Sequence, residues 1–426
     1  MLKSFTLQNA FSFADKHELD MQATKIKAHN YSLLTSYNNK NIPAGIDILP
    51  VMSIYGANAS GKTNLVRALL FVLQSIVYDE KNINHHVLPY MLNTFISEDD
   101  QVNFPSFDLT FLLNRNEYTL TIHSLVGVFH YEELSWREAA KGKIKRIYRR
   151  TWNEKTKRWS LTVGSTIFDK CLIDEIKYVN SMEKNNKNLL LYALCKRNQH
   201  NLFDAILRWV SCFDTAKYYI NNSVNAGLIY TGDENPYLEY YNESKSKGRI
   251  LNFLQTMNPH IKDYQFIELD NPPSTTHKYE LCFEYNRRRK TDSTTKNVDK
   301  VLSSHESKGL YSAFTLLPAI LKALENGGVL VFDELENSLH PLLMSKVVGM
   351  FTDPDVNIGG GQLIFTTHNA LIMDRKYLRQ DEIGFVEKDD NGRSEFYRLS
   401  DIDGVRSDLD FCKKYILGAF GAVPKL

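Results

Sequence analysis

One eight-residue segment restricts the fold of this chain more than any other. It is Gly56–Thr63, which reads GANASGKT and matches the pattern G-x-x-x-x-G-K-[S/T] at every fixed position. An apolar run at 48–55 precedes it and predicts a buried strand, and an apolar run with helical spacing at 64–73 follows it. In this setting, backbone N–H groups and a helix N-terminus can surround phosphate oxygens. The segment therefore predicts a phosphate-binding loop, against the alternative of a glycine-rich turn that happens to contain a lysine.

The residues of this loop have separate expected roles. Lys62 is expected to reach the β- and γ-phosphates of ATP, and the Thr63 hydroxyl is expected to ligate Mg²⁺. ATP and Mg²⁺ are thus the expected cofactors. The rest of the predicted phosphate cradle consists of Gly56, Asn58, Ala59, Ser60 and Gly61.

Two later strands are predicted to end in polar residues. The apolar run 328–332 is followed by Asp333 and Glu334, and the run 362–367 is followed by His368. In nucleotide hydrolases, an Asp at such a strand end holds magnesium through water, and the adjacent Glu orients or deprotonates the attacking water. His368 fits a γ-phosphate sensor, because a neutral imidazole can donate to phosphate or accept from water. We therefore predict Asp333 as a metal ligand and Glu334 and His368 as catalytic, although His368 taken alone also fits a structural histidine.

A third polar element, 306–309, opens the helix predicted before the Asp-Glu strand. Ser307 and Gly309 at a helix N-terminus can form a second anion site. The alternative is an ordinary helix cap, and the sequence alone leaves both interpretations open.

Composition bounds the class of protein. The chain has 426 residues, of which 43% are hydrophobic and 24% charged, with a net charge of +1. This is a globular composition with enough apolar residues for a sizeable core, and any contact with nucleic acid must come from a local patch. The five cysteines form no C-x-x-C pair, which predicts free thiols in a reducing compartment. With no signal-peptide pattern and no long apolar stretch, we expect a soluble, cytoplasmic protein that does not contact a membrane.

The pattern of elements predicts an α/β fold class. Buried apolar strands that alternate with helices favour a parallel, helix-flanked sheet around the phosphate loop. The region 105–165 reads mostly as an antiparallel sheet, and 168–213 has helical periodicity. We expect three parts: 1–165 with the phosphate loop and the antiparallel sheet, an inserted and mostly helical or mixed subdomain at 166–300, and 301–426 with the second set of motifs.

In chain order, four segments resemble the motifs of ABC-type ATPase heads. These are a Walker A loop, an abbreviated signature, a Walker B strand with its D-loop, and a switch, at Gly56–Thr63, 306–309, 333–341 and 367–369. The chain looks like the SMC/RecF/RecN branch, and within it like the compact AAA-family ATPases of phage-defence systems (AbiL-, OLD- and PARIS-like). The final segment, 415–424, is also similar to that family.

The resemblance is uneven along the chain. It covers 1–80 and 302–426 well, 105–160 loosely and 165–300 hardly at all. The signature has Ser and Gly but lacks the full L-S-G-G-Q pattern, and Gln101 is only a positional candidate for a Q-loop.

The resemblance implies an ATP sandwich of two protomers, as a homodimer or a higher homo-oligomer. One protomer would supply its loop, strand-end acids and His368, and the other would supply Ser307 and Gly309. The implied function is an ATP-hydrolysing sensor or regulator of a separate effector, a nuclease or toxin, in antiviral defence by abortive infection. The alternatives are a DNA-repair or chromosome-maintenance ATPase, for which sustained heptads are missing, and a scaffold whose ATP site is structural.

Two basic stretches could contact nucleic acid. The segment 141–158 carries nine basic residues with interleaved aromatic residues, and 287–290 reads Arg-Arg-Arg-Lys. One interpretation is a surface that follows a phosphate backbone. The other is a solvated hairpin face whose charges prevent edge-to-edge aggregation. The nine residues are Lys141, Lys143, Lys145, Arg146, Arg149, Arg150, Lys155, Lys157 and Arg158.

Overall fold

A computed structural model describes most of the chain. The described residues are 1–26, 29–83, 104–125, 127–138, 142–164, 170–197, 199–211, 238–268, 279–287, 297–302, 305–337, 339–406 and 408–424. They fall into two compact units. The first comprises Met1–Lys217, Ala323–Leu335 and Ser345–Leu426, and the second comprises Tyr218–Lys322 and Glu336–Met344. Gln101, Lys141 and 288–290 lie outside the described residues.

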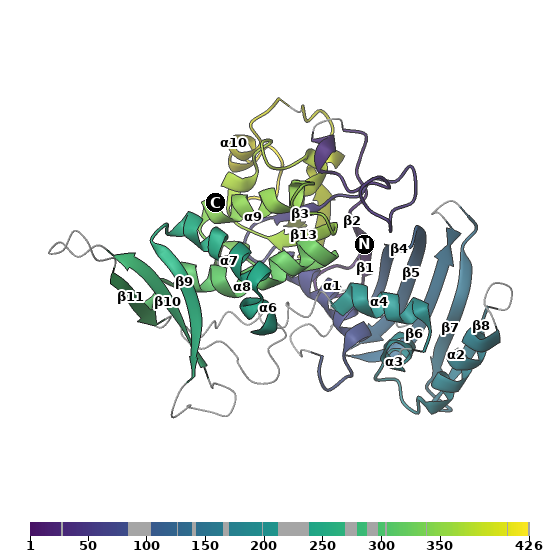
Figure 1. Ribbon diagram of the computed structural model, residues 1–426. Coiled ribbons are helices and arrows are strands. Elements are labelled where there is room, and N and C mark those ends of the chain that lie inside the picture. The colour runs from purple at the N-terminus through teal and green to yellow at the C-terminus, as the bar shows by residue number, and fades with distance from the viewer. Residues whose placement is uncertain are drawn as a thin grey trace. The chain divides into compact units, whose positions relative to one another are not determined.

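A five-stranded sheet carries the phosphate loop in the first unit (Figure 1). Its order is β12 (Gly328–Phe332), β13 (Gly361–Thr366), β3 (Val51–Tyr55), β14 (Ile383–Lys388) and β15 (Ser394–Arg398). The first four strands are parallel, and β15 pairs antiparallel with β14. Every residue of β12, β13 and β3 is buried, as expected of parallel strands covered on both faces. Helix α1 (Lys62–Val77) packs against β12 and β13.

The first unit also contains a seven-stranded antiparallel sheet. Its order is β2 (His17–Asp20), β1 (Leu2–Gln8), β4 (Ser106–Leu113), β5 (Asn116–Leu125), β6 (Val128–Arg137), β7 (Lys145–Asn153) and β8 (Arg158–Val163). Side chains alternate between its faces: Leu109, Leu120 and Leu134 lie in one cross-strand row, and polar residues lie in the next. These two sheets confirm the predicted α/β class with a parallel sheet and an antiparallel β subdomain.

Helices cover the apolar face of the antiparallel sheet. They are α2 (Lys170–Met182), α3 (Leu190–Arg197) and α4 (Asn201–Ser211), together with α1 (Figure 1). Phe71 of α1 stacks on Phe129 at 5.9 Å between ring centroids, and Trp209 of α4 stacks on Phe111 at 4.6 Å. The sequence predicts one inserted subdomain at 166–300. In the structure, α2, α3 and α4 belong to the first compact unit, and the second unit begins at Tyr218.

The second unit is a small mixed domain. It contains α6 (Leu238–Asn242), α7 (Ser244–Met257), the first part of α8 (Lys308–Asn326), and an antiparallel sheet of β9 (Ile261–Glu268), β10 (Tyr279–Arg287) and β11 (Asn297–Leu302). Its core is aromatic, with Phe314 stacked on Tyr241 at 4.7 Å and edge-to-face with Tyr264 at 4.8 Å.

The remaining elements that the structure describes are two α-helices and five 3₁₀ helices. They are α9 (Pro341–Thr352), α10 (Phe411–Ile416) and the 3₁₀ helices η1 (Asn30–Ser32), η7 (Leu335–Asn337), η8 (Ala370–Ile372), η9 (Gln380–Glu382) and η10 (Leu399–Asp401). None of the helices in the described part of the chain is both long enough and apolar enough to cross a membrane.

Candidate functional site

The phosphate loop connects β3 to α1, and both of its fixed glycines are required by close packing. A Cβ on Gly56 would lie 2.2 Å from the carbonyl oxygen of Val386. A Cβ on Gly61 would lie 2.2 Å from Ser394 Oγ, and Gly61 also has a φ of +115°, which side chains disfavour. The β14–β15 hairpin therefore approaches the loop so closely that only glycine fits at these two positions.

Lys62 is held across the loop. Its side chain is only 5% exposed, and Nζ donates to the carbonyl oxygens of Gly56 at 2.9 Å and of Ala57 at 3.0 Å. Thr63 follows in the first turn of α1 and is half-buried, while Asn58 and Ala59 are exposed at the loop tip. The loop thus keeps a cation at its centre, beside the N-terminus of a sixteen-residue helix.

A network of hydrogen-bonded side chains connects the phosphate loop to β15 and to Ser12. Ser394 Oγ donates to the carbonyl oxygen of Ser60 at 2.6 Å and lies 2.7 Å from Ser12 Oγ, which accepts from Asn64 Nδ2 at 2.8 Å. Ser12 and Ser394 are both buried. Sequence reasoning missed these two serines, because each is distant from the loop in sequence and belongs to no motif.

The strand-end acids meet at the edge of β12 and β13. Parallel pairing sets Phe332 opposite Phe365, so Asp333 and Glu334 lie beside Thr366. Thr366 Oγ1 donates to Asp333 Oδ1 at 2.6 Å and accepts from the Glu334 N–H at 2.8 Å. Glu334 has a φ of +52°, a left-handed conformation that is costly for a residue of this size.

His368 follows the same strand and is exposed. The residue before it, Thr367, is buried and donates its N–H to the carbonyl oxygen of Ile54 at 3.0 Å, next to the phosphate loop. The residue after it, Asn369, accepts from the Leu371 N–H at 3.1 Å and caps η8. The structure therefore brings the loop, the two acids and His368 to one edge of the five-stranded sheet.

Ser307 and Gly309 lie in the second unit, at the start of α8. Ser307 Oγ accepts from the Leu310 N–H at 3.3 Å, so Ser307 serves as a helix cap within its own chain. Both residues are exposed, and a Cβ on Gly309 would meet no atom within 4 Å among the described residues. The neighbouring Glu306 accepts from the Tyr285 hydroxyl at 2.7 Å, which fixes the entry to the helix.

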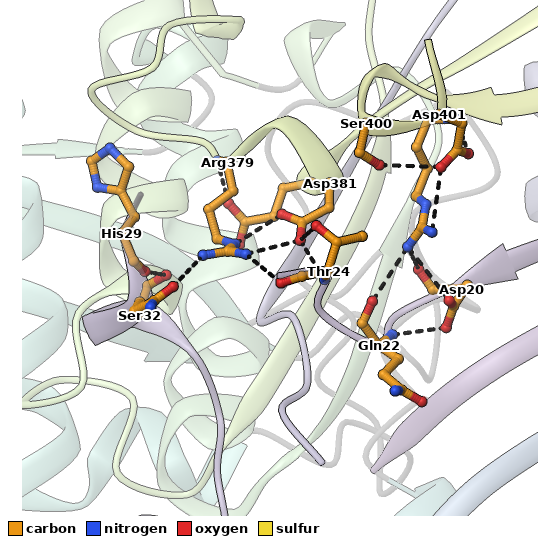
Figure 2. Close-up of polar contacts among 12 residues, drawn as sticks. Asp20, Gln22, Thr24, His29, Ser32, Arg379, Asp381, Ser400 and Asp401 are labelled. Carbon is orange, nitrogen blue, oxygen red and sulfur yellow. Dashed lines mark hydrogen bonds and ion pairs between the residues drawn. The ribbon is translucent and has the colours of Figure 1, made fainter. Parts of the chain in front are cut away.

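A buried ion pair lies next to the residue that is bonded to β3. Arg379 donates through Nε and Nη2 to the two carboxylate oxygens of Asp381, at 2.8 and 2.9 Å, and Thr24 donates to the same carboxylate (Figure 2). The next residue, Glu382, accepts from Ser53 of β3 through its backbone carbonyl at 2.9 Å. Burial, strengthened by the charge of Asp381, raises the pKa of the Glu382 carboxyl to about 8.

The C-terminal segment contacts the start of the phosphate loop. Burial raises the pKa of Tyr415 in α10, and a hydrogen bond with the Gly56 backbone opposes that shift. The Ala422 N–H donates to Glu387 Oε2 at 2.6 Å, and the Tyr397 hydroxyl donates to the Phe420 carbonyl at 2.8 Å. These bonds attach the segment to β14 and β15.

One basic residue of the segment 141–158, Arg150, lies in the interior, contrary to both interpretations of this segment. Arg150 is fully buried and pairs with Glu132, with Nε and Nη2 both 2.7 Å from Oε2. The same carboxylate accepts from the Tyr148 hydroxyl at 2.7 Å and from two backbone N–H groups at the start of α3, at 2.8 and 2.9 Å. The Arg150 guanidinium also lies 3.9 Å from the ring centre of Trp159. Arg150 therefore belongs to the interior and cannot contact a nucleic acid.

The other basic side chains of this segment divide into paired and exposed groups. Arg146 lies 3.2 Å and Arg149 lies 4.0 Å from Glu133, and Lys157 lies 2.6 Å from Glu154. The remaining exposed cations with a described position are Lys143, Lys145, Lys155 and Arg158. The charge available to a ligand is therefore smaller than the sequence suggests.

Comparison with known proteins supports an ATPase-type domain. Residues 284–374 match a family model described as "AAA domain, putative AbiEii toxin, Type IV TA system". This match spans Ser307, Gly309, Asp333, Glu334 and His368, but not the phosphate loop. No curated protein matches the sequence.

Several solved structures are similar to this chain, at low identity. The chain is similar to an SmcHead bound to the C-winged helix domain of ScpA, with 14% identity, coverage of 93% of this chain and 97% of that one, and a TM-score of 0.40. It is similar to the SMC head domain from Thermotoga maritima, with 14% identity, coverage of 93% and 98%, and a TM-score of 0.38. It is also similar to an Smc head domain with a coiled coil and joint from Pyrococcus yayanosii, with 12% identity, coverage of 98% and 99%, and a TM-score of 0.39.

Proposed function

We propose that this chain is an ABC/SMC-type ATPase that binds ATP with Mg²⁺ and hydrolyses it. The observation that carries the proposal is the meeting of the phosphate loop with Asp333, Glu334 and His368 at one sheet edge. The match of 284–374 to an AAA-domain model supports it independently of the loop, because that match lies outside Gly56–Thr63.

Each residue has a chemical role in this proposal. The loop N–H groups and Lys62 bind the β- and γ-phosphates, and the cation lowers the cost of bringing these negative charges together. The Thr63 hydroxyl and the Asp333 carboxylate are hard oxygen ligands of the kind that Mg²⁺ takes, directly or through water. A bound Mg²⁺ would neutralise charge on the phosphates. Glu334 orients and deprotonates the attacking water, and His368 donates to the γ-phosphate.

The second part of the proposal is a shared site between two copies. Ser307 and Gly309 are exposed at the start of α8, and no described atom of their own chain fills the space beside Gly309. A phosphate from the partner's nucleotide would meet the N–H groups of this helix end. ATP would then hold a homodimer, or a higher homo-oligomer, until hydrolysis releases it.

Mixing two defective variants tests the shared site. Lys62→Ala should lose ATP binding, and Ser307→Arg should block the trans contact, so each alone should be inactive. A mixture should recover part of the hydrolysis, because one of the two sites in a mixed dimer is intact. Ser244→Arg, at the exposed start of α7, is the matched control for the added charge. If folded, associating variants show no recovery, the sites are self-contained.

A trapping experiment tests hydrolysis itself. Glu334→Gln should bind ATP and accumulate as a dimer in size-exclusion chromatography, while turnover falls by about 10²–10⁴. Turnover at the wild-type rate would remove Glu334 from the chemistry. Slow turnover in the wild type, with tight ATP retention, would instead support a scaffold whose ATP site is structural.

The biological role we propose is regulation of a separate effector, a nuclease or toxin, in antiviral defence through abortive infection. The match to a family model described as a putative toxin of a type IV toxin–antitoxin system supports the defence setting, and the separate effector is the part of the proposal that the next experiment tests. A nuclease assay with the purified chain tests the separation of roles. Metal-dependent cleavage of DNA or RNA that persists in Glu334→Gln would show that the chain is its own effector.

A DNA-directed ATPase for repair or chromosome maintenance is the second candidate. The exposed cations Lys143, Lys145, Lys155 and Arg158 favour it, because they offer a local phosphate-binding surface. Strong stimulation of ATP hydrolysis by DNA ends would support this candidate over the regulator of an effector.

A further inference from the structure

The hydroxyl group of Thr366 connects the two strand-end acids. It donates to Asp333 Oδ1 at 2.6 Å and accepts from the Glu334 N–H at 2.8 Å, and the Thr366 side chain is fully buried. A hydroxyl has one hydrogen, so this pair of bonds assigns its direction: the hydrogen points to Asp333 and a lone pair to Glu334. No sequence motif assigns a role to this residue.

The bond to Asp333 fixes the orientation of its carboxylate. A hydrogen bond to an ionised acceptor is among the stronger ones, and at 2.6 Å it restricts rotation about the terminal torsion. With Oδ1 engaged by Thr366, the other carboxylate oxygen of Asp333 would be the one to hold Mg²⁺, directly or through water.

The bond to Glu334 stabilises an unfavourable backbone. Glu334 has a φ of +52°, and such a conformation persists only where surrounding contacts hold the backbone in place. The Thr366 oxygen supplies one such constraint, because it binds the N–H of this very residue. The backbone position of Glu334 in turn sets the direction in which its side chain leaves the strand end.

Thr366 is also the last residue of β13, two residues before His368. The intervening Thr367 is bonded through its N–H to Ile54 of β3, so the strand end itself is anchored beside the phosphate loop. We propose that Thr366 is a positioning residue for ATP hydrolysis: its hydroxyl orients Asp333 toward Mg²⁺ and Glu334 toward the attacking water. This inference rests on the proposed ATPase function.

Four substitutions separate this role from a general effect on stability. Thr366→Val keeps the shape and removes the hydroxyl, whereas Thr366→Ser keeps the hydroxyl. Thr352→Val is the matched control, since the Thr352 hydroxyl donates at 3.3 Å to the carbonyls of Val348 and Gly349 in its own helix. Thr366→Ala, compared with Thr366→Ser, isolates the hydroxyl again if the valine variant does not fold.

The readouts are the kcat of ATP hydrolysis, the Mg²⁺ concentration for half-maximal rate, and ATP affinity in EDTA. For Thr366→Val we expect kcat to fall about 10- to 100-fold, as removal of one partner of a buried polar pair allows. The half-maximal Mg²⁺ concentration should rise severalfold, and ATP affinity without Mg²⁺ should stay within about threefold. Thr366→Ser should recover most of kcat, and Thr352→Val should match the wild type.

Two results would overturn the inference while leaving the proposed function intact. One is a folded Thr366→Val or Thr366→Ala with wild-type kcat and Mg²⁺ dependence. The other is a parallel loss of kcat and of Mg²⁺-free ATP affinity, which indicates a structural role. A wild-type protein that neither binds nor hydrolyses ATP would overturn the proposed function and this inference together.

Discussion

Two charged regions of the first unit differ in how deeply their carboxylates are buried. At the edge of the five-stranded sheet, Asp333 and Glu334 are half-buried, and Glu334 has a strained backbone. Inside the antiparallel sheet, Glu132 is fully buried and accepts from Arg150, from Tyr148 and from the first N–H groups of α3. A carboxylate whose bonds are all satisfied internally stabilises a fold, whereas one held at an edge can act on a ligand. Substitutions in the two regions should therefore fail in different ways.

The largest effect on stability is expected inside the antiparallel sheet. Arg150→Met should lower the free energy of unfolding by about 3–5 kcal/mol, because it leaves the Glu132 charge buried without its partner. Arg149→Met, on the same strand but 41% exposed, is the control and should change it by less than about 1 kcal/mol. Urea denaturation measures both. Equal losses in the two variants would contradict the distinction between buried and exposed charges.

At the sheet edge, the corresponding change should affect binding rather than folding. Lys62→Ala should weaken ATP binding by about 100-fold or more, because it removes the cation that faces the phosphates. Its melting temperature without nucleotide should stay within a few degrees of the wild type, because the two carbonyls to which Lys62 donates belong to the loop itself and connect no other element to the fold. Lys155→Ala, at the exposed turn between β7 and β8, should change neither quantity. Calorimetric titration with ATP gives the affinity. Loss of the folded state in Lys62→Ala would contradict the expectation that this lysine affects binding rather than folding.

Residues in motifs could be identified from the sequence, whereas residues that act through single hydroxyl groups could not. The phosphate loop has fixed residues at fixed spacing, and parallel strands bring their C-terminal ends together, so Lys62, Asp333 and His368, which the sequence singled out, lie at the same end of the sheet. Ser394 and Thr366 act through single hydroxyl groups, which leave no spacing pattern. They can be found only when strands distant in sequence are paired.

The basic segment shows why a count of charges is insufficient. Alternation along β7 was visible in the sequence: Arg150 shares a face with Tyr148 and Trp152, while Arg149 points to the other side. A run of cations gave no indication of this difference. Strand periodicity was thus the pattern that could have identified Arg150 as an interior residue.

A pH series extends the comparison to another fully buried acid, Glu382. The folded-state pKa of Glu382 is about 8, above its ordinary value of 4.5, so the folded state binds this proton more tightly than the unfolded state does. Its contribution to stability is complete below pH 4.5 and is lost as the pH rises through 8. Relative to Glu382→Gln, the wild type should lose about 2 kcal/mol between pH 5.5 and pH 7.5.

Denaturation at several pH values measures this difference. Glu395→Gln, an exposed position on β15, is the control and should show no change with pH relative to the wild type. A constant difference between the wild type and Glu382→Gln across this range would contradict the raised pKa.

The smallest effects on stability are expected at the exposed cations. Replacing Lys143, Lys145 and Arg158 by Gln should each change the free energy of unfolding by less than about 0.5 kcal/mol. If these residues contact a nucleic acid, each should reduce the slope of log affinity against log salt by about one. An unchanged slope in a filter-binding series would leave the segment as a solvated hairpin face.

The left-handed backbone of Glu334 has a consequence for how far this molecule could be stabilised. Asparagine and glycine occupy such dihedral angles more readily than glutamate does. Glu334→Asn should therefore melt at a higher temperature than the wild type while losing turnover. An engineer who selected variants of this chain for heat resistance alone would enrich inactive ones at this position, since part of the folding free energy is given up there for reactivity.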